Sequence, residues 1–252
     1  MKKKIILLDG GMGQELIKNS KSDPHTLWST YVMLKEPELV RKAHVDFIEA
    51  GASVVTLNTY STTPERLEAN NLLDKFSFFH KKAIDLAREA IDHTQKDVLI
   101  AGCLPPLVWS YRPDKAPDYD KCVDLYLRIV REQENFVDLF ICETMASIKE
   151  AKAAVMAAKT SGKTIWCGLT LEDNQSCELR SGEKLIDCVN ELQSLGQEEF
   201  VLNCSFPEVI DKGMTILSRN SKFFGGYGNG FKSIEPCLLY TSPSPRDLDI
   251  SR

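Results

Sequence analysis

Short apolar runs alternate with longer amphipathic segments along most of the chain. The apolar runs have the length and residue content of buried strands. They predict seven strands, at residues 5–9, 53–58, 98–103, 139–143, 164–170, 200–204 and 223–227. Between them, apolar positions recur at helical spacing. This spacing predicts helices at residues 36–49, 63–93, 119–134, 147–160, 182–194 and 207–218.

Alternating strands and helices indicate a parallel sheet with right-handed crossovers, either an open doubly wound sheet or an eight-stranded barrel. The placement of polar residues favours the barrel, which gathers the C-terminal ends of its strands around one site. A dinucleotide-binding sheet would carry Gly-x-Gly-x-x-Gly after the first strand, and residues 10–13 do not match it. We therefore expect a (β/α)8 TIM barrel. The residues at or just past predicted strand ends are Asp9, Asn58, Cys103, Glu143, Thr170, Cys204 and Asn229.

The eighth strand and helix that a barrel needs after residue 227 are missing from this pattern. Residues 237–252 contain two prolines and no usable apolar period. A disordered tail is one interpretation. We favour a foreign segment that replaces the native ending, because a barrel without its last strand has open edges. Residues 1–236 are assigned to an incomplete barrel domain and 237–252 to a tail outside it.

The composition and charge of the chain exclude some classes of protein. The 252 residues are 43% hydrophobic, which suits one large α/β domain. The net charge of -5 comes from interspersed acids and bases, with no basic block for nucleic acid. The N-terminal apolar run is too short for a signal peptide, and no run would span a membrane. We expect a cytoplasmic protein that acts on small molecules, with no nucleic-acid or membrane partner.

Three residues near the later strand ends are candidates for chemistry. Cys204 precedes a predicted helix start, where the helix dipole favours a thiolate that can bind metal or attack an electrophile. A buried structural thiol is the alternative, as we expect for most of the eight scattered cysteines. Glu143 ends an apolar run, so its carboxylate needs either a substrate ammonium or a salt bridge. Asn229 lies in a glycine-rich turn at the same predicted rim.

The first two strands end in further binding candidates. Asp9 is followed by Gly10 and Gly11, whose bare backbone would let a small ligand approach the amides. A tight turn is the alternative. Asn58 and Thr59 occupy the corresponding position after the second strand, where ordinary turn chemistry is again the alternative.

Short motifs spread through the chain carry a family resemblance. The chain resembles the homocysteine S-methyltransferase family of zinc-dependent barrels over residues 5–236. The motifs are Leu8-Asp9-Gly10-Gly11, Leu27-Trp28-Ser29, Pro37-Glu38-Leu39-Val40, Ala50-Gly51-Ala52, Asn58-Thr59-Tyr60, Ser110-Tyr111-Arg112-Pro113-Asp114, Glu143-Thr144 and Asn203-Cys204-Ser205.

The resemblance implies a (β/α)8 barrel whose zinc ion (Zn2+) is held by one cysteine after strand six and an adjacent pair after strand eight. Cys204 matches the first ligand. Asp9, Gly10 and Glu143 match the groups that hold the amino-acid part of homocysteine in relatives. Asn229 matches an asparagine that approaches the metal when substrate is absent. The paired cysteines are missing here.

The reaction implied is methyl transfer from a sulfonium donor, S-methylmethionine or S-adenosylmethionine, to the zinc-bound thiolate of homocysteine, giving methionine. Because one thiolate does not hold zinc tightly, we expect the 252-residue form to be inactive, although its native counterpart is active. Methylation of another thiol or a selenol is one alternative. A non-catalytic barrel that binds an amino acid is another.

Overall fold

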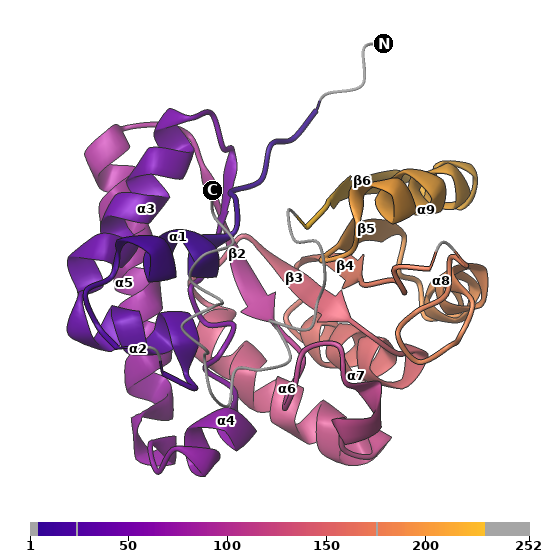
Figure 1. The fold of residues 1–252 in the computed structure, drawn as a ribbon, viewed down its shortest axis with the longest axis horizontal. Coiled ribbons are helices and arrows are strands. Elements are labelled where there is room, and N and C mark those ends of the chain that lie inside the picture. The colour runs from indigo at the N-terminus through magenta and orange to yellow at the C-terminus, as the bar shows by residue number, and fades with distance from the viewer. Residues whose placement is uncertain (1–4, 24, 175, 230–252) are drawn as a thin grey trace. The chain divides into compact units, whose positions relative to one another are not determined.

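The computed structural model describes residues 5–23, 25–174 and 176–229. The chain forms two compact units. It crosses from one to the other within strand β2 (Leu99–Leu104), helix α6 (Tyr119–Gln133) and strand β3 (Leu139–Met145), which are labelled in Figure 1. Unit 1 comprises Met1–Cys103 and Ile129–Phe140, and unit 2 comprises Leu104–Arg128 and Ile141–Arg252.

Unit 1 contains mostly helices and the first strands. β1 pairs with β2 in parallel, with Val54 opposite Leu99. Helix α3 packs against α5, and both present one apolar face to the interior. The elements are α1 Met12–Asn19, α2 Trp28–Lys35, α3 Pro37–Glu49, β1 Val54–Thr56, α4 Pro64–Ala69, the 3-10 helix η1 Leu73–Lys75, α5 Phe76–Thr94 and β2 Leu99–Leu104.

Unit 2 consists of strands that alternate with helices. β4 pairs with β5 in parallel and β5 with β6, with Cys167 opposite Phe200 and Glu199 opposite Phe223. Strand neighbours follow the order β1-β2-β3-β4-β5-β6, and a helix connects each strand to the next. This is the connectivity of a (β/α)-barrel. The elements are η2 Pro113–Lys115, α6 Tyr119–Gln133, β3 Leu139–Met145, α7 Ile148–Lys159, β4 Thr164–Leu169, α8 Leu185–Ser194, β5 Glu199–Asn203, α9 Pro207–Asn220 and β6 Phe223–Tyr227.

Six of the seven predicted strands are confirmed, and the first is reduced to one bridge. Leu8 pairs in parallel with Val54, and the Asp9 N–H donates to the Val54 carbonyl at 3.0 Å. Ile5 is 89% exposed. The pairing is short because its partner β1 has only three residues.

The predicted helix at residues 63–93 is wrong as a single element. It breaks into α4, η1 and α5, because Asn71 has a left-handed backbone (φ 55°) that ends a helical run. The Asn70 amide donates to the Arg66 carbonyl at 2.7 Å and closes α4. Helices α1 and α2 were not predicted. Both are only eight residues long, and α2 buries polar Ser29 and Thr30.

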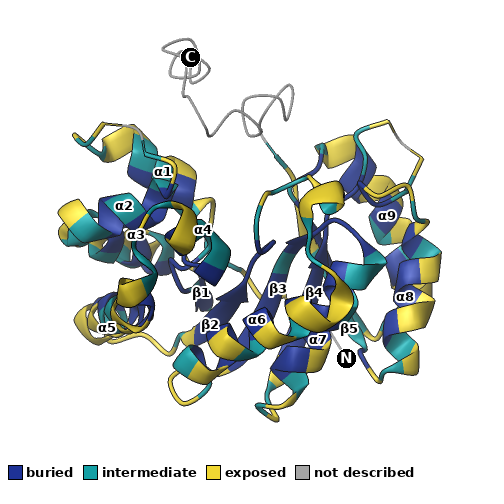
Figure 2. Cartoon of the chain, turned by 90° about the horizontal axis from the view of Figure 1, so that it is seen from below, coloured by how far each residue is buried: buried dark blue, intermediate teal, exposed yellow. Residues whose placement is uncertain are grey.

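Strands β1 to β5 are largely buried, whereas the residues of β6 are half-buried or exposed. The helices have one buried and one exposed face (Figure 2). Of the cysteines in the described residues, Cys103, Cys142 and Cys167 are buried as expected. No helix within the described ranges combines the length and apolar content needed to cross a membrane. The expectations for an eighth strand and for residues 237–252 fall outside those ranges.

Candidate functional site

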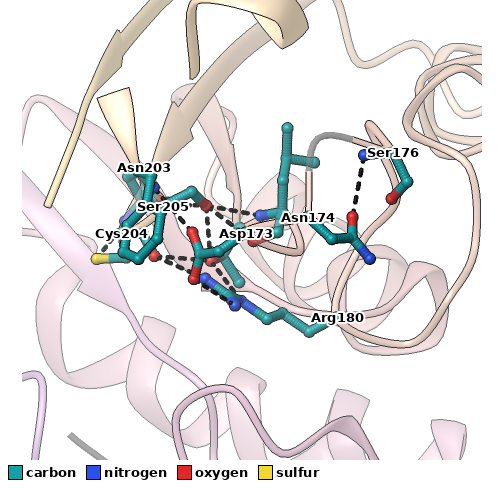
Figure 3. A network of polar contacts seen from close by, with 10 residues as sticks. Asp173, Asn174, Ser176, Arg180, Asn203, Cys204 and Ser205 are labelled. Carbon is teal, nitrogen blue, oxygen red and sulfur yellow. Dashed lines mark hydrogen bonds and ion pairs between the residues drawn. The ribbon is translucent and has the colours of Figure 1, made fainter. Parts of the chain in front are cut away.

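Cys204 follows directly after β5, in unit 2, and is half-buried. Its backbone is left-handed (φ 55°), which is uncommon for a residue other than glycine. The Thr144 hydroxyl donates to its sulfur at 3.4 Å. The Asn203 amide also donates to the sulfur at 3.4 Å (Figure 3). Hydrogen bonds to the charged form of an ionisable group favour that form. The contacts therefore suit a thiolate at Cys204.

The side chain of Asn203 links β5 to β3 past the intervening strand β4. Its Oδ1 accepts from the Thr144 N–H at 3.1 Å, and its Nδ2 donates to the Thr144 hydroxyl at 2.9 Å. Gly168 of β4 makes room for this link, because a Cβ there would lie 3.2 Å from Asn203 Oδ1 and 2.8 Å from the Cys142 carbonyl oxygen. A residue on β4 thus decides whether β3 and β5 can share a polar contact.

Glu143 and Asn229 lie in the same unit as Cys204. Glu143 is half-buried beside Thr144 in β3; burial, and secondarily the Glu143 charge, raise the pKa of the neighbouring Cys142 thiol. The Asn229 N–H donates to the Ser205 carbonyl at 2.8 Å, one residue past Cys204. Its Nδ2 is buried, and no acceptor among the described residues bonds to it. Such an amide is an unusual feature that a ligand would satisfy.

Two further residues contact this cluster and were not predicted as site residues. Thr144 has a left-handed backbone (φ 58°) and donates to the Cys204 sulfur. The Tyr227 hydroxyl, at the end of β6, accepts from Asn203 Nδ2 at 3.1 Å. Thr144 follows Glu143 in one of the motifs, which was the only available signal for it.

The described residues do not complete a zinc site. Within residues 5–23, 25–174 and 176–229, no three His, Cys, Asp or Glu side chains are grouped closely enough to hold a metal ion. Cys204 supplies one thiolate, whereas a zinc site needs three or four protein ligands. Cys237 lies outside the described residues.

In unit 1, the Asp9 carboxylate binds Thr56, the last residue of β1. Its two carboxylate oxygens accept from the Thr56 N–H at 2.7 Å and the Thr56 hydroxyl at 3.0 Å. A Cβ on Gly10 would lie 2.6 Å from the ring of Phe47, so glycine is required here by packing. Gly11 precedes α1 and has no atom closer than 4.0 Å to its Cβ position. These contacts fix Asp9 and Gly10 before α1, and the binding role expected for Asp9, Gly10 and Gly11 stays a prediction.

Asn58 and Thr59, also in unit 1, are buried with 4% and 1% exposure. Asn58 Nδ2 donates to the Ser29 carbonyl at 3.2 Å, which ties the end of β1 to α2. The Thr59 hydroxyl accepts from Gln133 Nε2 at 3.3 Å. These bonds fix the loop after β1.

Gln133 is the centre of a buried network beneath that loop. Its Oε1 accepts from the Cys103 N–H at 3.0 Å, and its amide nitrogen lies 3.1 Å from His80 Nδ1. Burial lowers the pKa of His80 to about 3, so the ring is neutral at physiological pH. The network joins Thr59 to Cys103 at the ends of β1 and β2.

Comparison with known proteins shows which family this chain is similar to. The family model for homocysteine S-methyltransferase matches residues 6–242. Homocysteine S-methyltransferase of Escherichia coli (strain K12) is 28% identical over 233 residues, 86% of this chain and 71% of the relative. Homocysteine S-methyltransferase YbgG of Bacillus subtilis (strain 168) is 26% identical over 92% of this chain and 79% of its own length.

Solved structures confirm the fold class. The homocysteine methyltransferase MmuM from Escherichia coli, in its metallated form, superposes with a TM-score of 0.81 at 24% identity. The match covers 98% of this chain and 95% of that one. The α/β fold with strands in sequence order is therefore shared.

Proposed function

Because this chain belongs to the homocysteine S-methyltransferase family, we propose that it transfers a methyl group from a sulfonium donor to the thiol of L-homocysteine, giving methionine. S-methylmethionine and S-adenosylmethionine are the proposed donors, and the cytoplasm is the proposed compartment. The observation that carries the proposal is Cys204, held by two hydrogen-bond donors at the C-terminal end of β5. Active sites of barrel enzymes lie at these strand ends.

The thiol of homocysteine must first lose its proton to solvent, because the thiolate is the nucleophile. Its sulfur then attacks the donor methyl in line. A new carbon–sulfur bond forms, the bond from methyl to the donor sulfonium breaks with its electron pair, and the donor leaves as a neutral sulfide. In unit 2, Glu143 is the proposed partner of the substrate ammonium. Asn229 offers its buried amide nitrogen to the bound substrate.

Zinc activation of homocysteine is the family's known chemistry, and the described residues fit it only in part. Cys204 has the position of a ligand, but a single thiolate gives too little affinity. We therefore expect this 252-residue chain to bind zinc weakly and, as the sequence also indicates, to have turnover close to background.

The test is a methyl-transfer assay with 13C-methyl donors and L-homocysteine, followed by NMR detection of labelled methionine. Each of S-methylmethionine, S-adenosylmethionine and betaine is supplied with and without equimolar zinc. The Cys204→Ser and Glu143→Gln variants are matched by Glu191→Gln, whose carboxylate pairs with Lys152 on the surface. We expect slow, zinc-dependent methionine formation that Cys204→Ser abolishes and Glu191→Gln leaves unchanged.

The single thiolate of the described residues favours a second candidate, a barrel that binds homocysteine without methylating it. Calorimetry with homocysteine separates the two. Binding that Glu143→Gln weakens, with no product from any donor, would support the second candidate. An absence of both binding and product would refute both functions. Rapid methylation of other thiols or a selenol in preference to homocysteine would change the substrate.

A further inference from the structure

Residues 204–206 are bound by the segment that follows β4, within unit 2 (Figure 3). The Thr170 hydroxyl donates to the Cys204 carbonyl oxygen at 3.1 Å. The Leu171 N–H donates to the Ser205 hydroxyl oxygen at 2.8 Å. The backbone on the C-terminal side of Cys204 therefore depends on contacts from outside its own strand.

Arg180 is the central residue of these contacts. Its side chain is 2% exposed and forms an ion pair with Asp173 at 2.9 Å. Its Nη2 donates to the Cys204 carbonyl oxygen at 3.2 Å, and its Nε to the Thr170 hydroxyl at 3.4 Å. A buried guanidinium is costly unless its charge and its donors are matched. The bonds to Cys204 and Thr170 contribute to that match.

Asp173 binds the backbone on the C-terminal side of Ser205. While Oδ2 pairs with Arg180, Oδ1 accepts from the Phe206 N–H at 2.9 Å, at the start of α9. An acceptor at a helix N-terminus is favoured by the helix dipole. The two charged side chains thus bind the carbonyl of residue 204 and the amide of residue 206.

Cys204 needs such support because its backbone is left-handed, a conformation that persists only where the surroundings enforce it. Relaxation of this backbone would rotate the sulfur away from Thr144 and Asn203. We propose that Arg180 is a positioning residue, which holds the Cys204 sulfur in place through the Cys204 carbonyl. The role in catalysis rests on the proposed function, whereas the effect on the sulfur does not.

The test measures how fast each cysteine is alkylated by iodoacetamide at constant pH, using peptide mass spectrometry. In Arg180→Met, the rate at Cys204 should fall about tenfold, because the sulfur loses the donors that favour its reactive thiolate form. The buried thiols of Cys142, Cys167 and Cys188 in the same unit should remain slow. They report whether the unit is still folded.

Conservative variants sharpen the result. Arg180→Lys keeps the charge but loses the planar guanidinium group that contacts three partners. The alkylation rate of Cys204 in this variant should therefore lie between the rates in wild type and in Arg180→Met. Asp173→Asn keeps an acceptor for the Phe206 N–H and should lower the Cys204 rate less than Arg180→Met. Glu191→Gln removes an ion pair on the surface of the same unit and should leave all rates unchanged.

Two results would overturn the inference: a Cys204 rate in Arg180→Met that is not at least twofold below that of wild type, or a rise in the rates of the three buried cysteines. Alkylation needs neither substrate nor donor. A selective fall at Cys204 in a chain that never methylates homocysteine would therefore support the positioning effect and refute the proposed function alone. In an active chain, a selective fall with unchanged kcat and KM would overturn the role in catalysis.

Discussion

Substituting Gly168 by alanine is expected to break the link between β3 and β5. A Cβ at this position would lie 2.8 Å from the Cys142 carbonyl oxygen and 3.2 Å from Asn203 Oδ1. The carbonyl belongs to the neighbouring strand and does not retreat without disturbing the sheet. The Asn203 side chain is the part that gives way, so it should lose its bonds to Thr144.

The size of the effect follows from three contributions to the free energy of unfolding. Overpacking in a well-packed interior costs about 1–3 kcal/mol. The Thr144 N–H, on a residue with 0% exposure, loses its acceptor, at roughly 1–3 kcal/mol. Alanine restricts the unfolded chain and returns about 0.4–1 kcal/mol. The net loss is about 1–6 kcal/mol, or a fall of about 0.3–3 M in the urea midpoint at a slope of about 2–3 kcal/mol/M.

The assay is urea unfolding followed by circular dichroism and tryptophan fluorescence, because buried Trp166 lies in β4 close to the substitution. The control is Gly225→Ala in β6, where the nearest atom to the new Cβ is Val201 Cγ1 at 3.7 Å. Its free energy of unfolding should change by less than about 0.5 kcal/mol. If Gly168→Ala lost no more stability than Gly225→Ala, the steric role of Gly168 would be refuted.

Three further predictions concern stability. Burial lowers the pKa of His44 to about 4 and of His80 to about 3, so the unfolded chain binds protons first as the pH falls below about 6.5. Above that pH the two histidines should not reduce the free energy of unfolding of unit 1. Between pH 7 and pH 5 this free energy should fall by roughly 2 kcal/mol per histidine, and by less in His80→Gln. Urea midpoints at each pH measure the change. Tyr126→Phe removes a buried hydroxyl that donates at 2.9 Å to a carbonyl, and should cost about 1–3 kcal/mol in the same assay; a loss below about 0.5 kcal/mol would contradict this. Gly10→Ala places a methyl group 2.6 Å from the Phe47 ring and should lower the thermal midpoint through about 1–3 kcal/mol of overpacking, unlike a substitution at an open glycine.

The sequence predicted β1 to β5 well because each is an apolar run that is largely buried. β6 was predicted from the same kind of run, although none of its residues is buried. The break inside residues 63–93 was missed because the apolar period continues across it. The interruption comes from the left-handed backbone of Asn71, and the pattern of apolar positions carries no information about backbone conformation. Helix α2 was missed because it buries Ser29 and Thr30, which a hydrophobic period does not count as interior.

For the site, the sequence located the strand ends but not the contacts made there. Cys204 and Asn229 were selected from their positions, and the structure joins their segments through Ser205. Asn203 and Thr144 are 59 residues apart, and their contact exists only because β3, β4 and β5 are neighbours. No local pattern in the sequence encodes that adjacency.

The cysteines show why geometry, rather than composition, selects a reactive group here. Of the seven thiols in the described residues, five are buried, and burial raises the pKa of Cys167 and Cys188, which keeps them protonated and inert. Cys177 and Cys204 are half-buried, and Cys204 is bound by donors from β3 and from its own strand. Because Arg180 holds the carbonyl of the same residue, its sulfur and its backbone are fixed by separate groups. A thiol fixed in this way loses little conformational entropy when it meets a ligand, which is the physical basis for proposing Cys204 as the reactive thiol.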